Sequence, residues 1–568
     1  MIATRPLTPI LAFSAAFAAL ATAAPAANAA TYSLGADPAT ACATLLQAGF
    51  GAVEIDSSVL QKPYPITVAE KGPTPASRVS PASPAFCEVL GRIESISPNT
   101  PPIRFELNLP VEWNGRALQY GGGGFNGVVI TGLGLPPAMP FDAPSPLARG
   151  FATYGTDSGH ESEPGEPPQA FALNDEAFRN FAYAAYKKVH DAARTLMERA
   201  YGRAPEKTYF MGSSEGGREA LTVAERYPED FDGIFARVPV INWTGLQHAG
   251  MRDGLATMGG GWMDRAQVLL VSNAVLAQCG GVDGIVDDPV SCKTQFDPAK
   301  LACAPGEAGD KCLNPAQIEA IRTLHAPYDF PFTLANGVTE YPGWGVSGEA
   351  NPSFGPTGGW RAWWLGSSPP TLPPSPTNGI AWIFGSGAIQ YIYVRDPNFD
   401  PRKYRPEDFA NRVREASALM DSTDPDLSAF KAHGGKLIML EHMSDYAQSP
   451  YAGINYFQSV EAKMGADSGH DFMRLYTAPG VDHVGSGAPA NVDMLNGLVD
   501  WAENGKPPGP LTVVEQSLEP AIATTRSLPL CEWPAWPHYN GGDAKSASSY
   551  SCDKGPQSAF TGSVRTAP

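Results

Sequence analysis

The stretch from Thr208 to Glu225, TYFMGSSEGGREALTVAE, decides the fold. A short apolar run at 208–211 precedes Gly212-Ser213-Ser214-Glu215-Gly216, and residues 218–225 have the composition of a helix. A strand, a sharp turn and a helix with serine at the apex form a nucleophile elbow, in which the serine hydroxyl is exposed beside a helix N-terminus. The alternative is an ordinary Gly/Ser turn, because G-x-S-x-G also arises by chance. The strand and helix on either side favour Ser214 as a nucleophile.

Further apolar runs continue the alternation of strands and helices. Strands are expected at residues 103–109, 117–120, 151–155, 233–238, 436–440 and 474–478. Such alternation predicts an α/β fold with a mostly parallel sheet that is covered by helices on both faces. Between about Trp243 and Leu427 the alternation is lost, and a Pro-rich run occurs at 369–376. We expect this segment to be a large lid domain, inserted between late core strands above the active site.

The chain is long for one compact core and is expected to divide into four parts. Residues 1–29 resemble a cleavable signal peptide, with an apolar stretch that ends in the small-residue pattern Ala27-Asn28-Ala29. Residues 30–242 and 428–568 are expected to form the hydrolase core, and residues 243–427 the lid. The protein is therefore expected to be secreted or periplasmic. Its formal charge of −18 disfavours nucleic acid and anionic membranes as partners, and leaves the oligomeric state open.

The even number of cysteines, eight, predicts disulfides in an exported chain. Pairing across short loops favours Cys42–Cys87, Cys279–Cys292, Cys303–Cys312 and Cys531–Cys552, although the sequence permits other connectivities. A zinc site is the alternative, and it is disfavoured because the sequence has no C-x-x-C and no Cys/His cluster.

A serine nucleophile needs a general base, which an acid must in turn orient. In the α/β-hydrolase order the acid and then the histidine follow the serine, each beyond the carboxyl end of a late strand. Asp445 and His483 occupy those positions, after the strands expected at 436–440 and 474–478. Asp482 and His442 are the alternatives. Asp482 adjoins His483 in the chain and is poorly placed to reach its ring, and His442 precedes the acid.

The oxyanion formed during ester cleavage needs two preorganised N–H donors. One is expected from Glu215, the residue after the nucleophile, and the other from the glycine-rich loop at 121–127. The alternatives for this loop are a flexible connection or a phosphate-binding turn. No G-K-[ST] and no dinucleotide-binding spacing follows it, which disfavours phosphate.

Taken together and in order, these motifs resemble the tannase/feruloyl esterase family of α/β-hydrolases, which includes mono(hydroxyethyl) terephthalate hydrolase. The shared stretches are EWNGR at 112–116 with the glycine loop, TDSGH at 156–160, GSSEGGRE at 212–219, DGIVD at 283–287, WRAWWLG at 360–366, and Ser444-Asp445 with Pro479-Gly480 and His483. The resemblance implies an acyl-enzyme mechanism with Ser214, Asp445 and His483 as the triad and Gly124 and Glu215 as oxyanion donors.

The chain also departs from this family. Members commonly carry a disulfide between the positions that are here Ser213 and Val484, so we expect Val484 to pack against the elbow instead. The family's calcium loop implies a structural Ca²⁺ at Asp283, Ile285 and Asp287, although Gly280 stands where a third acid is expected. A disulfide-bounded Asp-Gly turn is the alternative. No cofactor is expected for catalysis.

With the signal-like N-terminus, the resemblance implies a secreted serine carboxylic ester hydrolase acting on a small ester of a phenolic acid, of the feruloyl esterase or tannase type. Trp363 is expected to line the substrate pocket as an aromatic wall, with burial in the lid core as the alternative. Hydrolysis of terephthalate half-esters is a second candidate. The resemblance implies that such an enzyme binds the free carboxylate of its substrate with an arginine of the lid, and no arginine lies between Trp364 and Arg395, so this candidate is less favoured. A non-catalytic binding protein on a hydrolase fold is the alternative from another class.

Overall fold

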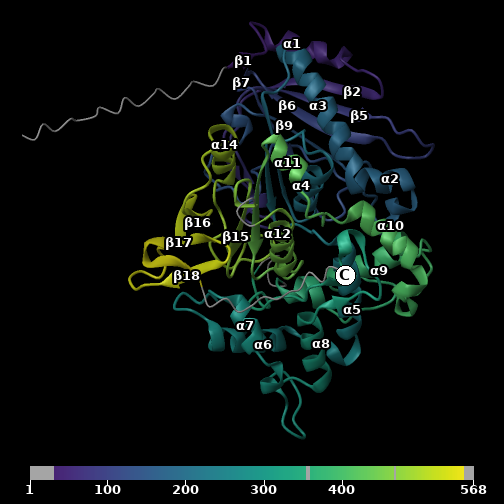
Figure 1. The fold of residues 1–568 in the computed structure, drawn as a ribbon, viewed down its shortest axis with the longest axis vertical. Helices are drawn as coiled ribbons and strands as arrows, with labels where there is room; N and C mark the ends of the chain where they lie inside the picture. The colour runs from purple at the N-terminus through teal and green to yellow at the C-terminus, as the bar shows by residue number, and fades with distance from the viewer. Residues whose placement is uncertain (1–30, 353–357, 466–468, 555–568) are drawn as a thin grey trace, which may run out of the picture.

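A computed structural model describes residues 31–352, 358–465 and 469–554; the expected signal peptide lies outside them. Within the described residues, eleven strands form one sheet in the order β16-β17-β15-β14-β11-β10-β8-β9-β6-β5-β2 (Figure 1). The strands are β2 (Val53–Gln61), β5 (Phe86–Ile93), β6 (Ile103–Pro110), β8 (Arg116–Tyr120), β9 (Ala152–Thr156), β10 (Lys207–Ser213), β11 (Gly233–Arg237), β14 (Lys436–His442), β15 (Met473–Ala478), β16 (Leu511–Ser517) and β17 (Ala523–Glu532).

The sheet is mixed, so the prediction of a mostly parallel sheet is correct only for its centre. Strands β9, β8, β10, β11, β14 and β15 run parallel to one another. At one edge β6, β5 and β2 are antiparallel, and at the other edge β17 and β16 are antiparallel. The strand expected at 103–109 is β6. The sequence reasoning did not find β2 and β16, because both are only partly buried and neither reads as a continuous apolar run.

Both faces of the central strands are buried under helices. Along β10, Tyr209 and Met211 lie in the core cluster that contains residues of α14 (Met494–Asn504). Phe210 lies in the opposite cluster, with residues of α4 (Glu215–Arg226) and α12 (Pro450–Met464). Successive side chains of a strand point to opposite faces, so this apolar run fills both layers of the core. The packing holds the carboxyl end of β10, and therefore the elbow, in place.

The chain between β11 and β14 is largely helical, although its sequence shows no regular alternation. It contains α5 (Trp243–Ala256), α6 (Arg265–Cys279), α7 (Pro289–Gln295), α8 (Pro315–His325), α9 (Ile380–Ala388), α10 (Ala410–Met420) and α11 (Ser428–His433), with the short strands β12 (Tyr328–Asp329) and β13 (Glu340–Tyr341). In Figure 1, α5 to α8 gather below the sheet, and α9 and α10 lie to their right. Because β11 and β14 are direct neighbours in the sheet, this segment is an insertion.

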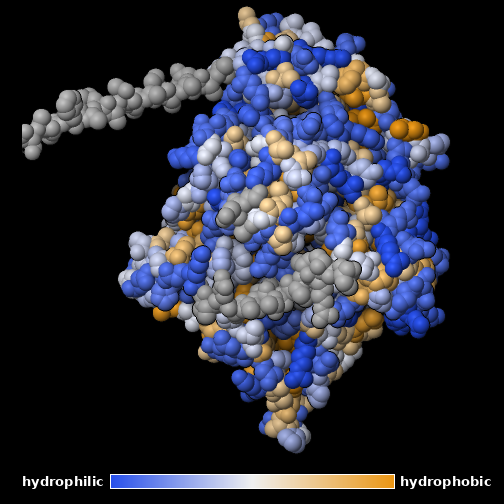
Figure 2. Space-filling model, in the orientation of Figure 1, coloured by the Kyte–Doolittle hydropathy of each residue, from blue (hydrophilic) through white to orange (hydrophobic). Residues whose placement is uncertain are grey.

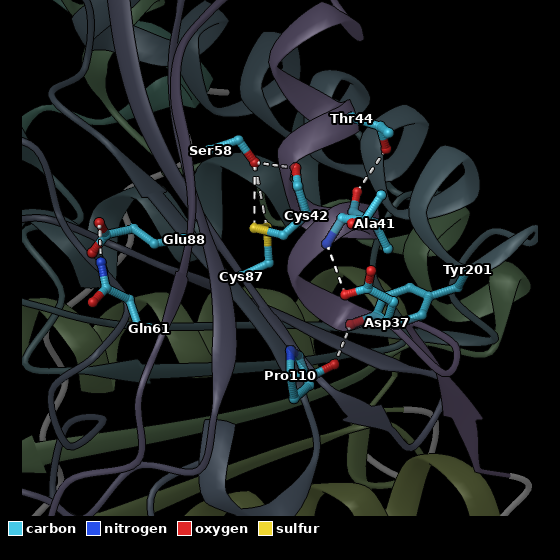
Figure 3. The surroundings of a disulfide bond; sticks show 11 residues. Asp37, Ala41, Cys42, Thr44, Ser58, Gln61, Cys87, Glu88, Pro110 and Tyr201 are labelled. Carbon is cyan, nitrogen blue, oxygen red and sulfur yellow. Dashed lines mark hydrogen bonds between the residues drawn. A yellow bond between two sulfur atoms is a disulfide. The ribbon is translucent and has the colours of Figure 1, made fainter.

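Four disulfides join the cysteines in the pairs favoured by short loops. Cys42–Cys87 ties α1 (Pro38–Thr44) to β5, where the Ser58 hydroxyl lies beside both sulfur atoms (Figure 3). The other bridges are Cys279–Cys292, Cys303–Cys312 and Cys531–Cys552. The view in Figure 2 shows a mainly hydrophilic surface with scattered apolar residues. No helix in the described part of the chain is both long and apolar enough to cross a membrane.

Candidate active site

The backbone at Ser214 has the strained geometry of a nucleophile elbow. Ser214 lies between the end of β10 and the start of α4, with φ 61° and ψ −121°, a conformation that non-glycine residues rarely adopt. The turn is so tight that a Cβ on Gly212 would lie 2.0 Å from the carbonyl oxygen of Gly216. Only glycine fits there, which explains the spacing of the motif. The serine hydroxyl is thereby held at the carboxyl edge of the sheet.

The three residues expected to form the triad meet at this edge. The imidazole Nε2 of His483 lies 2.9 Å from Ser214 Oγ, and its Nδ1 lies 2.6 Å from Asp445 Oδ2. The other carboxylate oxygen of Asp445 accepts the backbone N–H groups of Ala447 (2.7 Å) and Gln448 (3.0 Å). The carboxylate is therefore fixed on both oxygens, and it favours the tautomer with a proton on Nδ1. In that tautomer Nε2 is free to accept the serine proton.

The two alternative residues lie behind the imidazole and have other contacts. Asp482 accepts the N–H groups of Val484 (3.1 Å) and Ser486 (2.9 Å), so its carboxylate shapes the histidine loop. His442 is buried, with Nδ1 2.6 Å from the Asp482 carbonyl oxygen, and its burial holds its pKa well below the usual value. A neutral His442 donates from Nδ1 and supports the loop. This geometry favours Asp445 over Asp482 as the partner of His483.

The glycine-rich loop is fixed by residues that the sequence reasoning did not single out. Glu219, on α4, accepts the backbone N–H of Gly122 at 2.9 Å and the side-chain amide of Asn126 at 2.5 Å. The ring of His160 lies with Nε2 2.8 Å from the carbonyl oxygen of Phe125, and burial lowers the pKa of His160 to about 4. Neutral His160 can therefore donate to that carbonyl. In the sequence, the feature that pointed to His160 was the family-like TDSGH stretch at residues 156–160.

Gly124 and Glu215 line the same cavity as Ser214, as expected for oxyanion donors. Glu215 is the first residue of α4, where backbone N–H groups have no partner inside the helix. Its carboxylate is buried against Arg218, whose Nε donates to Oε1 at 2.7 Å. The same guanidinium donates to the carbonyls of Phe181 and Ala182. These contacts anchor the residue while its backbone faces the nucleophile.

The cavity beside the triad is narrow and mainly apolar, and several aromatic rings line it. It measures about 40 Å³ and is lined by Ser214, His483, Gly124, Glu215, Ala447, Gln448, Phe125, Val240, Trp243, Leu246, Gln247, Trp363 and Phe384. The Trp363 ring centre is 6.0 Å from the His483 ring and 5.8 Å from the Phe384 ring. Trp363 also packs against buried Tyr446, with ring centres 6.4 Å apart. It therefore borders both the cavity and the core of the insertion.

Arg237 links the elbow to the region behind His483, and no sequence motif indicated it. Its Nε donates to Ser213 Oγ at 2.8 Å, and its carbonyl oxygen accepts the N–H of Ser214 at 3.0 Å. A Cβ on Gly485 would lie 3.6 Å from its Nη1, which places the guanidinium next to the histidine loop. Burial lowers the pKa of Arg237 to about 10, against the opposing charges of Asp445 and Asp482. Ser213 therefore bonds to Arg237, and the expected packing of Val484 against the elbow stays a prediction.

The expected calcium loop contains two carboxylates that face each other around Gly281. Asp283 accepts the N–H of Ile285 (3.0 Å) and the hydroxyl of Tyr550 (3.1 Å), whereas Asp287 Oδ1 is buried with no hydrogen-bond partner among the described residues. Burial, and then the charge of Asp283, raise the pKa of Asp287 to about 7. No cluster of three or more His, Cys, Asp or Glu that could hold a metal occurs in the part of the chain that is described.

A serine on a strand–turn–helix, with histidine and aspartate from the ends of two further parallel strands, is the arrangement of α/β-hydrolase enzymes. Comparison with known proteins gives the family. The sequence profile described as "Tannase and feruloyl esterase" matches residues 87–553, so the chain belongs to the tannase and feruloyl esterase family. The resemblance inferred from the motifs is confirmed.

Named relatives are esterases. An uncharacterized esterase of Agrobacterium fabrum is 37% identical over 499 residues, covering 82% of this chain and 85% of the relative. Mono(2-hydroxyethyl) terephthalate hydrolase of Piscinibacter sakaiensis is 32% identical over 545 residues, covering 85% and 87%. A probable feruloyl esterase of Arthroderma benhamiae is 30% identical over 484 residues, covering 79% and 82%. The protein is therefore a carboxylic ester hydrolase.

Solved structures show the same fold. Feruloyl esterase B from Aspergillus oryzae superposes with a TM-score of 0.73 at 21% identity, covering 91% of this chain and 100% of that chain. Tannin acyl hydrolase from Aspergillus niger superposes with a TM-score of 0.66 at 18% identity, covering 90% and 94%. At these identities the likeness concerns the fold alone.

Proposed function

We propose that this protein is a secreted serine esterase that cleaves esters of phenolic acids such as ferulate, p-coumarate or gallate. The observation that carries the proposal is the chain of short contacts from Asp445 through His483 to Ser214, at the end of a cavity with aromatic walls. Aromatic side chains suit an aromatic acyl group, because the two kinds of ring can pack in stacked or edge-to-face arrangements. The probable feruloyl esterase among the relatives supports this substrate class.

In the proposed mechanism His483 Nε2 takes the proton of Ser214 as its oxygen attacks the ester carbonyl carbon. The resulting oxyanion accepts hydrogen bonds from the backbone N–H groups of Gly124 and Glu215. His483 then gives the proton to the leaving alcohol, and the acyl group stays on Ser214. A water molecule, deprotonated by His483, attacks the acyl-enzyme and releases the acid. Asp445 stays ionised and stabilises the imidazolium at each step.

The insertion between β11 and β14 is proposed to act as a lid that shapes the acyl site. It supplies Trp243, Leu246, Gln247, Trp363 and Phe384 to the cavity. A volume of about 40 Å³ is well below the roughly 300–1,000 Å³ of typical ligand sites, so side chains of the insertion must move to admit a substrate. Trp363, next to His483, is the proposed aromatic wall. We place the lid at residues 243–427, between the two parts of the hydrolase core.

Hydrolysis of terephthalate half-esters is the second candidate, favoured by the 32% identity to mono(2-hydroxyethyl) terephthalate hydrolase. A half-ester carries a free carboxylate, which a cation would stabilise in an apolar cavity. No Lys or Arg occurs among the described residues that line the cavity. Arg395 instead pairs with Asp175 and donates to the Leu173 carbonyl. These contacts favour an uncharged phenolic ring as the acyl group.

Export is proposed from the signal-like residues 1–29 and from the four disulfides, which form and persist in oxidising compartments. A structural calcium ion is proposed at the loop of Asp283, Ile285 and Asp287, because the buried Asp287 oxygen without a partner fits a cation ligand. This ion would stabilise the fold of the insertion and take no part in the reaction.

A hydrolysis panel tests the proposed function. Methyl ferulate, methyl gallate and mono(2-hydroxyethyl) terephthalate would be compared at equal enzyme concentration, with Ser214→Ala as the blank. We expect the two phenolic esters to have the higher kcat/KM, and Ser214→Ala to abolish turnover of all three. Preference for the terephthalate half-ester would favour the second candidate. Unchanged turnover by Ser214→Ala would overturn the serine mechanism.

A further inference from the structure

A glutamine side chain that bonds to none of the described residues lines the cavity beside the triad. Gln247, on α5, is 5% exposed and lines this cavity together with Ser214 and Trp363. Its side-chain amide makes no hydrogen bond to any described residue, although polar groups at this depth normally have partners. The reaction proposed above uses Ser214, His483, Asp445 and two backbone N–H groups, and it leaves this amide without a role.

The second glutamine of the cavity wall is partly engaged. Gln448 donates from Nε2 to Glu441 Oε2 at 3.0 Å, while its Oε1 is buried without a hydrogen-bond partner among the described residues. Its backbone N–H donates to Asp445, so the residue is held in place beside the triad. Gln247 has no such commitment, and its neighbours on the wall are Trp243, Leu246 and Phe384. A polar group placed among apolar neighbours costs free energy unless a ligand satisfies it.

We propose that Gln247 is a specificity-determining residue that binds the ring hydroxyl of the acyl group. The ester carbonyl must sit between Ser214 and the N–H groups of Gly124 and Glu215, so the aromatic ring extends along the wall that carries Gln247. An amide offers an acceptor oxygen and two N–H donors. It can accept a phenolic O–H and donate to the oxygen of an adjacent hydroxyl or methoxy group. The inference rests on the proposed function, because it assumes that this cavity receives the acyl group.

The consequence is selectivity for hydroxylated rings over rings without a hydroxyl. A site that hydrogen-bonds a substrate hydroxyl rejects the analogue that lacks it, because the group on the protein is left buried and unpaired. For one neutral hydrogen bond we expect a ratio of about tenfold or more in kcat/KM. The apolar wall would also disfavour a ring that carries a charged carboxylate.

The test compares methyl p-coumarate with methyl cinnamate, which differ only in the ring hydroxyl. Wild type should prefer the coumarate by about tenfold or more in kcat/KM. Gln247→Leu, similar in shape and apolar, should bring the ratio close to one, mainly by slowing the coumarate. Leu246→Ala, a change of the same wall that removes no polar group, should alter both substrates alike and keep the ratio. Melting curves check that each variant is folded.

Each outcome has a separate meaning. A wild-type ratio near one, or a Gln247→Leu variant that keeps the wild-type ratio, overturns the role of Gln247 and leaves the esterase proposal standing. If wild type hydrolyses neither ester but cleaves other esters, the phenolic acyl class itself fails.

Discussion

The two sides of the His483 ring differ in chemistry. In front of it lies the cavity, where Trp363 lies about 6 Å from the rings of Phe384 and His483 and the Gln247 amide has no hydrogen-bond partner among the described residues. Behind it lie Asp445, Asp482, His442 and Arg237, which are linked by short hydrogen bonds and opposite charges. The back is built to fix the position of the ring, and the front is built to receive a substrate. Changes behind the ring should slow all substrates, and changes in front should alter their ranking.

The triad gives the largest expected effect. Ser214→Ala, His483→Ala and Asp445→Asn should each lower kcat on the order of 10⁴-fold or more, because each removes the nucleophile, the base or the group that orients the base. Steady-state kinetics on methyl ferulate measures the loss. Asp482→Asn serves as the control, since Asp482 bonds to loop N–H groups and not to the imidazole. Near-full activity of Asp445→Asn together with an inactive Asp482→Asn would show that the acid is misassigned.

Arg237 provides the next test, at the back of the ring. Arg237→Met removes the bond to Ser213 and a positive charge near Asp445, so the elbow and the histidine loop lose a common contact. We expect kcat to fall on the order of tenfold to a hundredfold, with KM nearly constant and the same loss on phenolic and aliphatic esters.

A matched arginine separates this role from general stability. Arg116→Met removes a partly buried ion pair with Glu503 at the start of β8, far along the strand direction from the elbow. It should lower the melting temperature and leave kcat near wild type. Arg237→Lys keeps the charge and a donor for Ser213, and it should restore most of kcat. An Arg237→Met enzyme with wild-type kcat would mean that the back of the site needs no such link.

Trp363 tests the front of the ring and should have a smaller, substrate-dependent effect. Trp363→Ala removes an aromatic surface next to His483. We expect kcat/KM to fall about tenfold for methyl ferulate and about threefold or less for a short aliphatic ester. Kinetics on the two esters gives the ratio. An equal loss on both would mean that Trp363 acts by packing against the apolar cluster that joins the insertion to Tyr446.

The sequence predicted the parts of the site that depend on chain order, and missed those that depend on distant contacts. Ser214, Asp445 and His483 each follow an apolar strand, and the parallel sheet brings those strand ends together. Their geometry agrees with the expectation, and their catalytic role stays a proposal. Arg237 and Glu219 act on loops formed by other parts of the chain, and no local pattern marks such pairs.

The same reasoning explains the errors in the fold. Continuous apolar runs revealed the parallel central strands because both of their faces are buried. Strands β2 and β16, at the two edges, bury too few residues to give such a signal. The helices of the insertion were missed because long irregular segments and prolines separate them.

Chelation should have the smallest effect, and it tests a region away from the ring. If Asp283 and Asp287 hold calcium, EDTA removes a cation that offsets both the burial of the Asp287 carboxylate and its repulsion by Asp283, the two effects that raise the pKa of Asp287. The melting temperature should then fall by a few degrees, as expected when about 1 kcal/mol is lost from a large chain. Initial rates at 25 °C should be unchanged, because the triad needs no metal, and added Ca²⁺ should restore the melting temperature. Asp287→Asn removes one of the charges and should abolish the response to EDTA. Identical melting curves with EDTA and with Ca²⁺ would show that these aspartates form only a turn.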